Sequence, residues 1–467
     1  MKEELRAILE CIESEKTTTE DFAHARLPES MTAVQVRRCD VDMFQGLAFK
    51  DKDPRKSLQI DEVPLPPLGP NDVLVAVMAA AVNYNTVWTS IFEPAPGFTY
   101  LADFARMNKY NRHHNQDYHI MGSDASGVVI RTGEAVTRWE PGDRVTIYGA
   151  VVDPEAPENY ADSLRNPKLR AWGFETNFGA FADFTVVRQN QLLPKPEHLT
   201  WEEAASMALT ASTTYRMLVS ERGARMKQGD NILIWGASGG LGAFALQMAL
   251  NGGGFPIAIV SSDWKAEMVR RLGCSAVIVL DHHKGEGNFL KDDGSVALRD
   301  IQRLKVRIRR LTGGEDADIV FEHTGRATFA ASVGVAKVGG KIVTCGSTSG
   351  YEHVYDNRYL WQTVKSIIGS HGANYMEAMD TIRLACKGSI TPVLSTVYPF
   401  TDAKEAVYKL HNRSHVGKIG LLCLAPQEGL GIRDRELREQ VGEERINVFR
   451  ETPLTVAAKR HRRNAAA

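Results

Sequence analysis

The chain has 467 residues, of which 43% are hydrophobic, and 56 basic against 57 acidic side chains give a formal net charge of −1. This length allows two domains with full cores, and the balanced charge argues against nucleic acid or an anionic membrane as a partner. No apolar run approaches the roughly eighteen residues of a membrane span, and the six cysteines form no C-x-x-C pair. The first residues are charged and lack the apolar core of a secretory signal, so none is expected. We therefore expect a cytoplasmic protein with reduced thiols.

Residues 1 to about 30 are predicted to form a helical arm in front of a first domain that extends from 31 to 214. Within that domain short strands alternate with turns, as at 73–78, 125–130 and 142–147. This rhythm is typical of a compact, barrel-like β-rich domain.

From about residue 215 the pattern changes to an alternation of strands and helices, which predicts a parallel sheet covered by helices over 215–372. Strands are expected at 231–235, 256–260, 276–280, 317–323, 340–346 and 366–371. The polar segment 282–310 is expected to be a surface insertion. Residues 373–450 are expected to return to the first domain, and 451–467 to form a disordered tail.

A glycine-rich turn separates the first strand of the second domain from the helix that follows it. Gly236, Gly239 and Gly242 have the spacing G-x-x-G-x-x-G, which lets the backbone approach a pyrophosphate at the helix N-terminus. A bare glycine turn is the alternative, but the strand before it and the helix after it favour nucleotide binding. The other candidate cofactor contacts in this turn are Ser238, Gly240 and Leu241.

The end of the second strand of this domain indicates which nucleotide is bound. An acidic side chain there would bind the ribose of NAD, but the sequence has Ser261 and Ser262, with Lys265 within one helical turn. Two hydroxyl groups and one cation can hold a 2′-phosphate, so NADPH is favoured. A solvated turn, or an Asp263 side chain that turns inward, is the alternative. Further cofactor contacts are expected from Thr213, Cys345 and Gly346.

Three strings, together with the order of the two domains, resemble the medium-chain dehydrogenase/reductase superfamily. They are Gly142-Asp-Arg-Val, Gly179-Ala-Phe-Ala-Asp-Phe and Ser212-Thr-Thr-Tyr215. The resemblance implies an α/β fold in which a GroES-like, β-rich catalytic domain is joined to a Rossmann domain with a doubly wound parallel sheet.

The zinc-dependent branch of that superfamily carries a ligand cysteine and a Gly-His-Glu string. The matching positions here hold Asn83 and Gly122-Ser123-Asp124, and the four-cysteine lobe of that branch is missing. Because a catalytic zinc needs three N, S or O ligands, we expect a zinc-free reductase without a metal site.

Longer strings resemble the crotonyl-CoA carboxylase/reductases within this superfamily. They are Asp51-Lys-Asp-Pro-Arg-Lys-Ser, Val82-Asn-Tyr-Asn-Thr-Val-Trp88, Trp172-Gly-Phe-Glu-Thr-Asn-Phe-Gly179, Tyr355-Asp-Asn-Arg-Tyr-Leu-Trp361 and Ser370-His371. In that family CO2 is held by an asparagine, a phenylalanine–glutamate pair and a histidine, which match Asn85, Phe174, Glu175 and His371. Asn83 is the alternative to Asn85. The resemblance also implies a homotetramer that pairs nucleotide domains.

The four residue types suit reductive carboxylation. Hydride addition to the β-carbon of an enoyl thioester makes the α-carbon nucleophilic, so that CO2 and a proton compete for it. N–H groups of Asn85 and His371 can polarise CO2, Glu175 can fix the tautomer of His371, and Phe174 can exclude water. Each residue also has another explanation, since the asparagine can cap a turn, the aromatic ring and the imidazole can be core, and the carboxylate can be solvated.

The residue after His371 bears on the substrate. Crotonyl-specific members carry a phenylalanine there, whereas this chain has Gly372, and each further methylene buried in a wider acyl site contributes about 0.8 kcal/mol. We expect a 2-enoyl-CoA that is longer or more branched than crotonyl-CoA, and an alkylmalonyl-CoA product that serves as a polyketide extender unit. Alternatively, Gly372 relaxes a strand end and Tyr375 fills the gap.

A phosphate of CoA or of the cofactor is expected near Arg358, with Lys365 and Arg413 as rivals. Two other functions fit the sequence. One is an NADPH-dependent enoyl-thioester or quinone reductase that uses no CO2, for which Tyr84 or Tyr215 could donate the proton. The other is a catalytically inert NADPH-binding protein.

Overall fold

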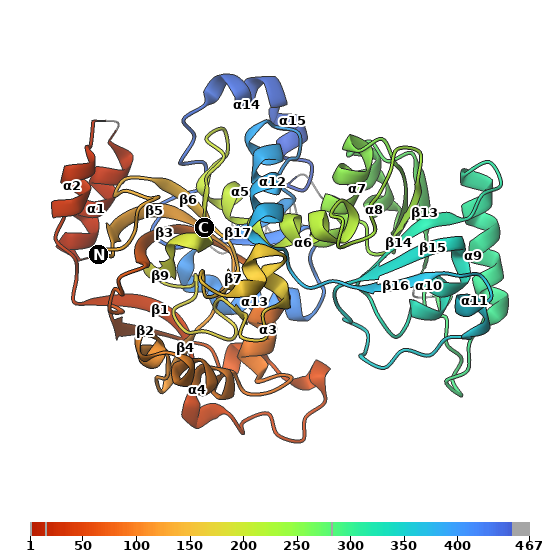
Figure 1. Ribbon diagram of the computed structural model, residues 1–467, viewed down its shortest axis with the longest axis horizontal. Coiled ribbons are helices and arrows are strands. Elements are labelled where there is room, and N and C mark those ends of the chain that lie inside the picture. The colour runs from red at the N-terminus through yellow and green to blue at the C-terminus, as the bar shows by residue number, and fades with distance from the viewer. Residues whose placement is uncertain (1, 15, 282–283, 451–467) are drawn as a thin grey trace, which may run out of the picture. The chain divides into compact units, whose positions relative to one another are not determined.

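The computed structural model describes residues 2–14, 16–281 and 284–450, which form two compact units (Figure 1). The first unit comprises residues up to 209, 374–388 and 394–443, and the second comprises 210–373, 389–393 and 444–450. The segments 210–214, 389–393 and 444–450, expected with the first domain, cluster with the second, and Thr391 N–H donates to Gln247 Oε1 there at 2.8 Å. The expected tail, 451–467, lies outside the described residues.

Two helices at the N-terminus, α1 (Glu3–Glu13) and α2 (Thr19–His24), pack onto the first unit. The buried side chains of α1 follow the helical spacing of one apolar face and are Leu5, Ile8, Leu9 and Ile12. These side chains share a core cluster with Phe178 and Phe184, so the predicted helical arm is part of the body of this unit.

The first unit contains two principal sheets. A three-stranded sheet has the order β2-β1-β4, and the larger sheet has the order β10-β6-β5-β3-β18-β17, with β9 also paired to β3. The strands of the first unit, including β7 and β8, which pair with each other, are β1 (Ser30–Arg37), β2 (Gln59–Pro64), β3 (Asp72–Val82), β4 (Tyr118–Ile120), β5 (Ala125–Thr132), β6 (Arg144–Ile147), β7 (Ala150–Val151), β8 (Arg170–Ala171), β9 (Phe184–Arg188), β10 (Leu192–Pro194), β17 (Leu394–Tyr398) and β18 (Lys418–Leu422). The last two come from the returning chain, and β18 pairs antiparallel with β3.

The first unit also contains α-helices outside its N-terminal pair and its boundary, and one of them, α3, carries Asn85. They are α3 (Tyr84–Ile91), α4 (Gly97–Met107), α5 (Trp201–Ala205), α12 (Tyr375–Cys386), α13 (Ala403–His411) and α14 (Arg435–Val441). Helix α6 (Ala208–Leu218) contains the boundary between the units, and the short α15 is Glu443–Ile446.

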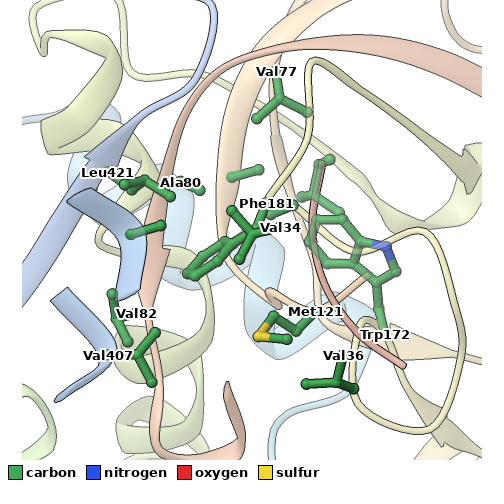
Figure 2. Packing of buried hydrophobic residues seen from close by; sticks show 14 of the residues in the cluster. Val34, Val36, Val77, Ala80, Val82, Met121, Trp172, Phe181, Val407 and Leu421 are labelled. Carbon is green, nitrogen blue, oxygen red and sulfur yellow. The ribbon is translucent and has the colours of Figure 1, made fainter. Parts of the chain in front are cut away.

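The apolar core of the first unit fixes the segments that carry candidate catalytic residues (Figure 2). Val82 ends β3 directly before Asn83, Met121 lies two residues before Ser123, and Trp172 begins the loop that holds Phe174. Burial of each such side chain contributes about 1.5–3 kcal/mol. The positions of three polar segments are therefore set by the apolar side chains beside them.

The second unit is a six-stranded parallel sheet with the order β13-β12-β11-β14-β15-β16. Its strands are β11 (Asn231–Ile234), β12 (Phe255–Val260), β13 (Ala276–Val279), β14 (Ala317–Glu322), β15 (Ala336–Thr344) and β16 (Ser366–Gly369). Its helices are α7 (Gly240–Asn251), α8 (Asp263–Arg271), α9 (Leu298–Leu311), α10 (Phe329–Val335) and α11 (Arg358–Trp361). Helices α7 and α8 cover one side of the sheet and α9 and α10 the other (Figure 1), so the predicted α/β fold with a doubly wound sheet is confirmed.

The expectation of a surface insertion over 282–310 is wrong for its second half. Residues 298–311 form α9, whose buried side chains Ile301, Leu304 and Ile308 join the core of the second unit. The spacing of these three residues is helical, but the many charged residues around them hid the apolar face. Among the described residues, no helix combines the length and apolarity that crossing a membrane requires.

Candidate active site

Two asparagines at the start of α3 have different environments. Asn83 is the N-cap residue of α3 and is buried, and its side chain donates to Asp124 Oδ2 at 2.9 Å and to Ser123 Oγ at 3.3 Å. Asn85 lies in the first turn and is half-buried, and its Nδ2 and Oδ1 lie 2.9 and 3.0 Å from Ser123 Oγ. Asn83 is thus the cap of α3, whereas the Asn85 side chain is not part of the cap and is bonded to Ser123.

The loop that follows β8 places Phe174 and Glu175 beside the same helix. The centre of the Phe174 ring lies 6.1 Å from that of Trp88 and 5.8 Å from that of Tyr100 on α4. Trp88 lies on α3, one turn beyond Asn85. Burial raises the pKa of Tyr100, and the negative charge of Glu175 raises it further. Glu175 Oε2 accepts a hydrogen bond of 2.7 Å from its own loop, at Ala171 N.

A close backbone approach explains why this loop contains a glycine. Gly173 has φ +68°, and a Cβ atom there would lie 1.9 Å from Gly122 O. The loop is therefore pressed against the residue that precedes Ser123. His119 also contacts this loop, since its Nε2–H donates to Thr176 O at 3.2 Å. The structure brings Asn85, Phe174 and Glu175 together within the first unit.

The positions at which the zinc-dependent branch carries ligands form a hydrogen-bonded group around a buried cation. Lys418 Nζ donates to Asp124 Oδ2 at 3.0 Å and to Asn83 Oδ1, and the Lys418 and Asp124 side chains are 4% and 0% exposed. The other Asp124 oxygen accepts from Leu209 N at 2.8 Å. Burial lowers the pKa of Lys418, and the charge of Asp124 opposes that shift.

Only one of these side chains, Asp124, is a common zinc ligand, and its oxygens are already occupied by N–H donors. Within the described part of the chain, no group of three or more His, Cys, Asp or Glu side chains is placed so that it could hold a metal ion. Sequence reasoning missed Lys418, for which the available signal was a cation inside the apolar string Gly417–Cys423.

The glycine turn of the second unit has the close contacts that the spacing predicts. Gly236 has φ +56°, Gly239 is the N-cap of α7, and a Cβ atom on Gly242 would lie 2.4 Å from Gly236 O. Ser238 in the turn is buried, and Gly240 and Leu241 begin α7. The first turn of this helix therefore packs tightly on the end of β11, with its N–H groups directed at the space beyond.

The end of β12 offers donors that suit a phosphate. Lys265 Nζ donates to Ser261 Oγ at 2.9 Å, and burial lowers the pKa of Lys265. Ser262 Oγ is buried and has no hydrogen-bond partner among the described residues, whereas Asp263 is exposed. A buried hydroxyl without a partner is costly, and an anion that accepts its proton would remove that cost. These residues fit the expected 2′-phosphate of NADPH.

Three further cofactor candidates lie on α6 and directly after β15. Thr213 is buried on α6, and Cys345 and Gly346 follow the carboxyl end of β15. Burial raises the pKa of Cys345 to about 12, so its thiol stays protonated at neutral pH. Carboxyl ends of parallel strands are where such sheets bind ligands, so these positions stay candidates for cofactor contacts.

His371 and Gly372 follow β16 at the carboxyl edge of the same sheet. His371 is exposed, so the alternative of a buried core imidazole is wrong for this structure. Gly372 has φ +57°, and no atom lies within 4 Å of the position that a Cβ atom would take. Tyr375, the residue that would fill this space in the alternative interpretation, donates its hydroxyl to Leu192 O at 2.9 Å.

The basic residues proposed for phosphate binding are engaged locally. Arg358 is exposed, and its guanidinium donates to both oxygens of Asp356, at 3.0 and 2.6 Å. Lys365 donates to Val333 O at 2.7 Å, and burial lowers its pKa to about 8. A phosphate contact for Arg358 stays a prediction.

Two family descriptions match the chain. "Alcohol dehydrogenase GroES-like domain" covers residues 69–197, and "Zinc-binding dehydrogenase" covers residues 240–386. Among curated proteins, the chain is 53% identical over 436 residues to a crotonyl-CoA reductase of Streptomyces collinus, which covers 93% of this chain and 97% of that protein. It is 38% identical over 410 residues to the crotonyl-CoA carboxylase/reductase of Cereibacter sphaeroides, with 86% and 90% covered.

The chain is also similar to solved structures of enoyl-CoA carboxylase reductases. The chain resembles the 2-octenoyl-CoA carboxylase reductase CinF in complex with NADP and 2-octenoyl-CoA, with a TM-score of 0.91, 49% identity and coverage of 97% and 99%. The apo structure of CinF from a Streptomyces species aligns with a TM-score of 0.88 and 48% identity over 97% of this chain and 100% of that one.

Proposed function

The chain belongs to the crotonyl-CoA carboxylase/reductase family of the medium-chain dehydrogenase/reductase superfamily, and from this premise we propose that it converts a 2-enoyl-CoA, CO2 and NADPH into an alkylmalonyl-CoA. The observation that carries the proposal is the assembly of Asn85, Phe174 and Glu175 in one neighbourhood of the first unit. The solved relative CinF is described as a carboxylase reductase in complex with NADP and an enoyl-CoA.

The cofactor is held by the second unit. The N-terminus of α7 would hold the pyrophosphate, and Ser261, Ser262 and Lys265 would bind the 2′-phosphate. When bound, NADPH supplies a hydride for the β-carbon of the enoyl thioester. The donor set around Lys418 does not fit a catalytic zinc, so the protein stabilises the thioester oxyanion with N–H and O–H donors.

The first unit decides what the α-carbon of the reduced thioester bonds to. CO2 and a proton compete for this carbon. Asn85 donates an amide N–H to an oxygen of CO2, and Phe174, packed against Trp88 and Tyr100, keeps water away from the carbanion. Glu175 directly follows Phe174 in the same loop, and its carboxylate accepts a hydrogen bond from Ala171 N. His371, the fourth residue of the set, is exposed and belongs to the second unit, and its hydrogen bond to CO2 stays a prediction.

The acyl chain of the substrate is longer than that of crotonyl-CoA. Gly372 leaves open space where a side chain would stand, and the similar protein CinF is described with 2-octenoyl-CoA. Four more buried methylenes correspond to a preference of about a hundredfold. The product would be a malonyl thioester with an alkyl branch, whose loss of CO2 can drive a carbon–carbon bond, as a polyketide extender unit requires.

A second function, enoyl reduction without CO2, is favoured by Tyr100. Burial and Glu175 raise the pKa of this phenol, so its O–H remains a proton donor close to Phe174. Protonation of the α-carbon by such a donor would give a saturated acyl-CoA.

Product masses distinguish these functions. The protein is incubated with NADPH and either crotonyl-CoA or 2-octenoyl-CoA, in CO2-free buffer or with bicarbonate and carbonic anhydrase. We expect a carboxylated acyl-CoA only with CO2, and a kcat/KM about a hundredfold higher for 2-octenoyl-CoA. Gly372→Asn, which tolerates the positive φ, should lower kcat/KM for the longer substrate more than for the shorter one.

The other outcomes are equally clear. A saturated acyl-CoA under both conditions means a CO2-independent reductase. NADPH binding without turnover of any enoyl-CoA means an inert NADPH-binding protein. An equal or higher kcat/KM for crotonyl-CoA refutes the longer substrate and leaves the reaction type standing.

A further inference from the structure

A continuous series of hydrogen bonds connects the buried ammonium of Lys418 to the side chain of Asn85. Lys418 contacts Asp124 and Asn83, Asn83 contacts Ser123, and Ser123 contacts Asn85. All but Asn85 are buried, and Ser123 is 1% exposed. Water therefore has little access to these bonds, and each polar group depends on its protein partner.

The orientation of the Asn83 carboxamide is fixed by the two charges beside it. Its Oδ1 accepts from the Lys418 ammonium, and its Nδ2 donates to the Asp124 carboxylate at 2.9 Å. A flipped amide would place oxygen against the carboxylate and NH2 against the ammonium, which is repulsive at both ends. The second N–H of Asn83 therefore remains directed at Ser123 Oγ, at 3.3 Å.

The hydroxyl proton of Ser123 is then directed as well. Ser123 Oγ accepts from Asn83 Nδ2 and from Asn85 Nδ2, the latter at 2.9 Å, and these bonds occupy its two lone pairs. Its single proton is donated to Asn85 Oδ1 at 3.0 Å. Both the oxygen and the nitrogen of the Asn85 carboxamide are thus hydrogen-bonded to one hydroxyl group. Its nitrogen uses one hydrogen for Ser123 and has a second hydrogen to donate.

We propose that Ser123 is a positioning residue for carboxylation: it fixes the Asn85 carboxamide so that one amide N–H is presented to CO2, and the Lys418–Asp124–Asn83 group fixes Ser123 in turn. This role rests on the proposed function, because it requires that Asn85 contacts CO2. The residues that replace zinc ligands in this chain thereby serve CO2 capture.

The fate of the α-carbon provides the readout for this role. Hydride transfer precedes the competition between CO2 and a proton, and Asn85 acts only in that competition. A looser carboxamide should therefore shift products from carboxylated to saturated acyl-CoA, while NADPH consumption continues. A residue that merely supports the fold would lower both products together.

The experiment measures the ratio of carboxylated to saturated product over a range of CO2 concentrations for wild type, Asn85→Ala, Ser123→Ala and the double variant. We expect Ser123→Ala to lower the ratio about tenfold, the effect of losing one hydrogen bond to a polar partner. Total NADPH consumption should stay within about twofold of wild type. The double variant should match Asn85→Ala, because the two side chains act as one unit.

Ser126→Ala is the matched control. Ser126 is also fully buried, on the adjacent β5, but its hydroxyl donates to Trp201 O at 2.6 Å and not to the site. This variant should keep the product ratio of wild type. If Ser123→Ala does not fold, as judged by Tm, Ser123→Cys replaces it, because the thiol has a similar size and is a much weaker donor.

Each result supports the inference or overturns it. A wild-type enzyme that carboxylates, with an unchanged ratio in Ser123→Ala and a lowered ratio in Asn85→Ala, refutes the positioning role alone. An unchanged ratio in Asn85→Ala removes the CO2 contact that Ser123 would position. A wild-type enzyme that yields only saturated product refutes the proposed function and the role of Ser123 with it.

Discussion

The ion pair of Lys418 and Asp124 places two opposite charges in the interior of the first unit, where their side chains are 4% and 0% exposed. Removing two charges from water is expensive, and an apolar pair of similar volume is often as stable as a buried ion pair. The Lys418 ammonium recovers this cost through contacts with Asp124, Asn83 and the Val82 carbonyl. Since stability alone does not call for such a pair, its use is better explained by the fixed orientation that it gives to neighbouring amide and hydroxyl groups.

His119 provides a pH-dependent prediction at the same scale. Its imidazole is fully buried beside the Phe98 ring, its Nδ1 has no partner among the described residues, and burial lowers its pKa to about 4. Between pH 6.5 and 4 the unfolded chain binds a proton at this residue and the folded chain does not. The free energy of unfolding should therefore fall by about 3 kcal/mol as the pH is lowered through that window.

Urea unfolding of wild type and His119→Gln, at several pH values between 7.5 and 4.5, measures this contribution. Glutamine can still donate an N–H to Thr176 O but does not titrate. The free energy of unfolding of the variant should depend less steeply on pH than that of wild type. Equal slopes would show that His119 is protonated as readily in the folded protein as in the unfolded one.

At the scale of elements, the string Asp51–Ser57 braces the helix that carries Asn85. Its 3-10 turn, Pro54–Lys56, packs against α3 and α13. Arg55 pairs with Asp53 at 2.8 Å and with Glu405 at 3.3 Å, and its guanidinium lies 3.5 Å from the centre of the Tyr408 ring. A string that has no direct place in the chemistry is thus explained by its support of α3.

Helix α7 gives a prediction for cofactor binding. A Cβ atom at position 242 would lie 2.4 Å from Gly236 O and 2.7 Å from Ala237 Cα, so Gly242→Ala must displace the first turn of α7 from the end of β11. A misplacement of about 1 Å can lower a catalytic rate about a hundredfold. We expect the displaced turn to raise the Kd for NADPH by at least about tenfold. Fluorescence titration with NADPH measures the effect.

Gly369→Ala is the control for this substitution. Gly369 lies in a strand of the same sheet, has no positive φ, and no atom lies within 4 Å of its added Cβ. Its Kd for NADPH should equal that of wild type. An unchanged Kd in Gly242→Ala would mean that the turn tolerates a side chain and that close packing of α7 does not determine binding.

At the scale of the whole molecule, the edge of the sheet in the second unit bears on assembly. Strand β16 pairs only with β15 within the described residues, and large apolar side chains are exposed on and beside it, namely Val338, Trp361, Val364 and Ile367. An exposed apolar edge strand is a template for pairing with another chain. This edge supports the proposal of a homotetramer in which nucleotide domains pair.

A charge on that edge should weaken the assembly. Ile367→Lys is expected to lower the molar mass measured by light scattering at micromolar concentration, because a lysine would be buried without a partner in a paired sheet. Met376→Lys adds the same charge at an exposed apolar residue of α12 and should leave the mass unchanged. The edge is not the contact if Ile367→Lys retains the mass of wild type, and a monomeric wild type refutes the tetramer itself.

Much of this protein could be predicted from its sequence, because the signals are local. The glycine spacing around Gly236, the strand–helix alternation and the long strings around Asn85 and Phe174 each lie within one short segment. The family and the two-domain fold predicted from these signals are confirmed by the relatives and the family descriptions. The roles of the individual site residues remain predictions.

Only the tertiary structure decided which distant groups meet. The antiparallel register of β18 and β3 pairs Ile419 with Val82 and so places Lys418 beside Asn83 and Asp124, across 294 residues of chain in the latter case. The buried face of α9 and the packing of α1 into the first unit were likewise settled by long-range contacts. Local patterns specify turns and strands, whereas hydrogen bonds between remote side chains depend on strand register, which no single segment of the sequence contains.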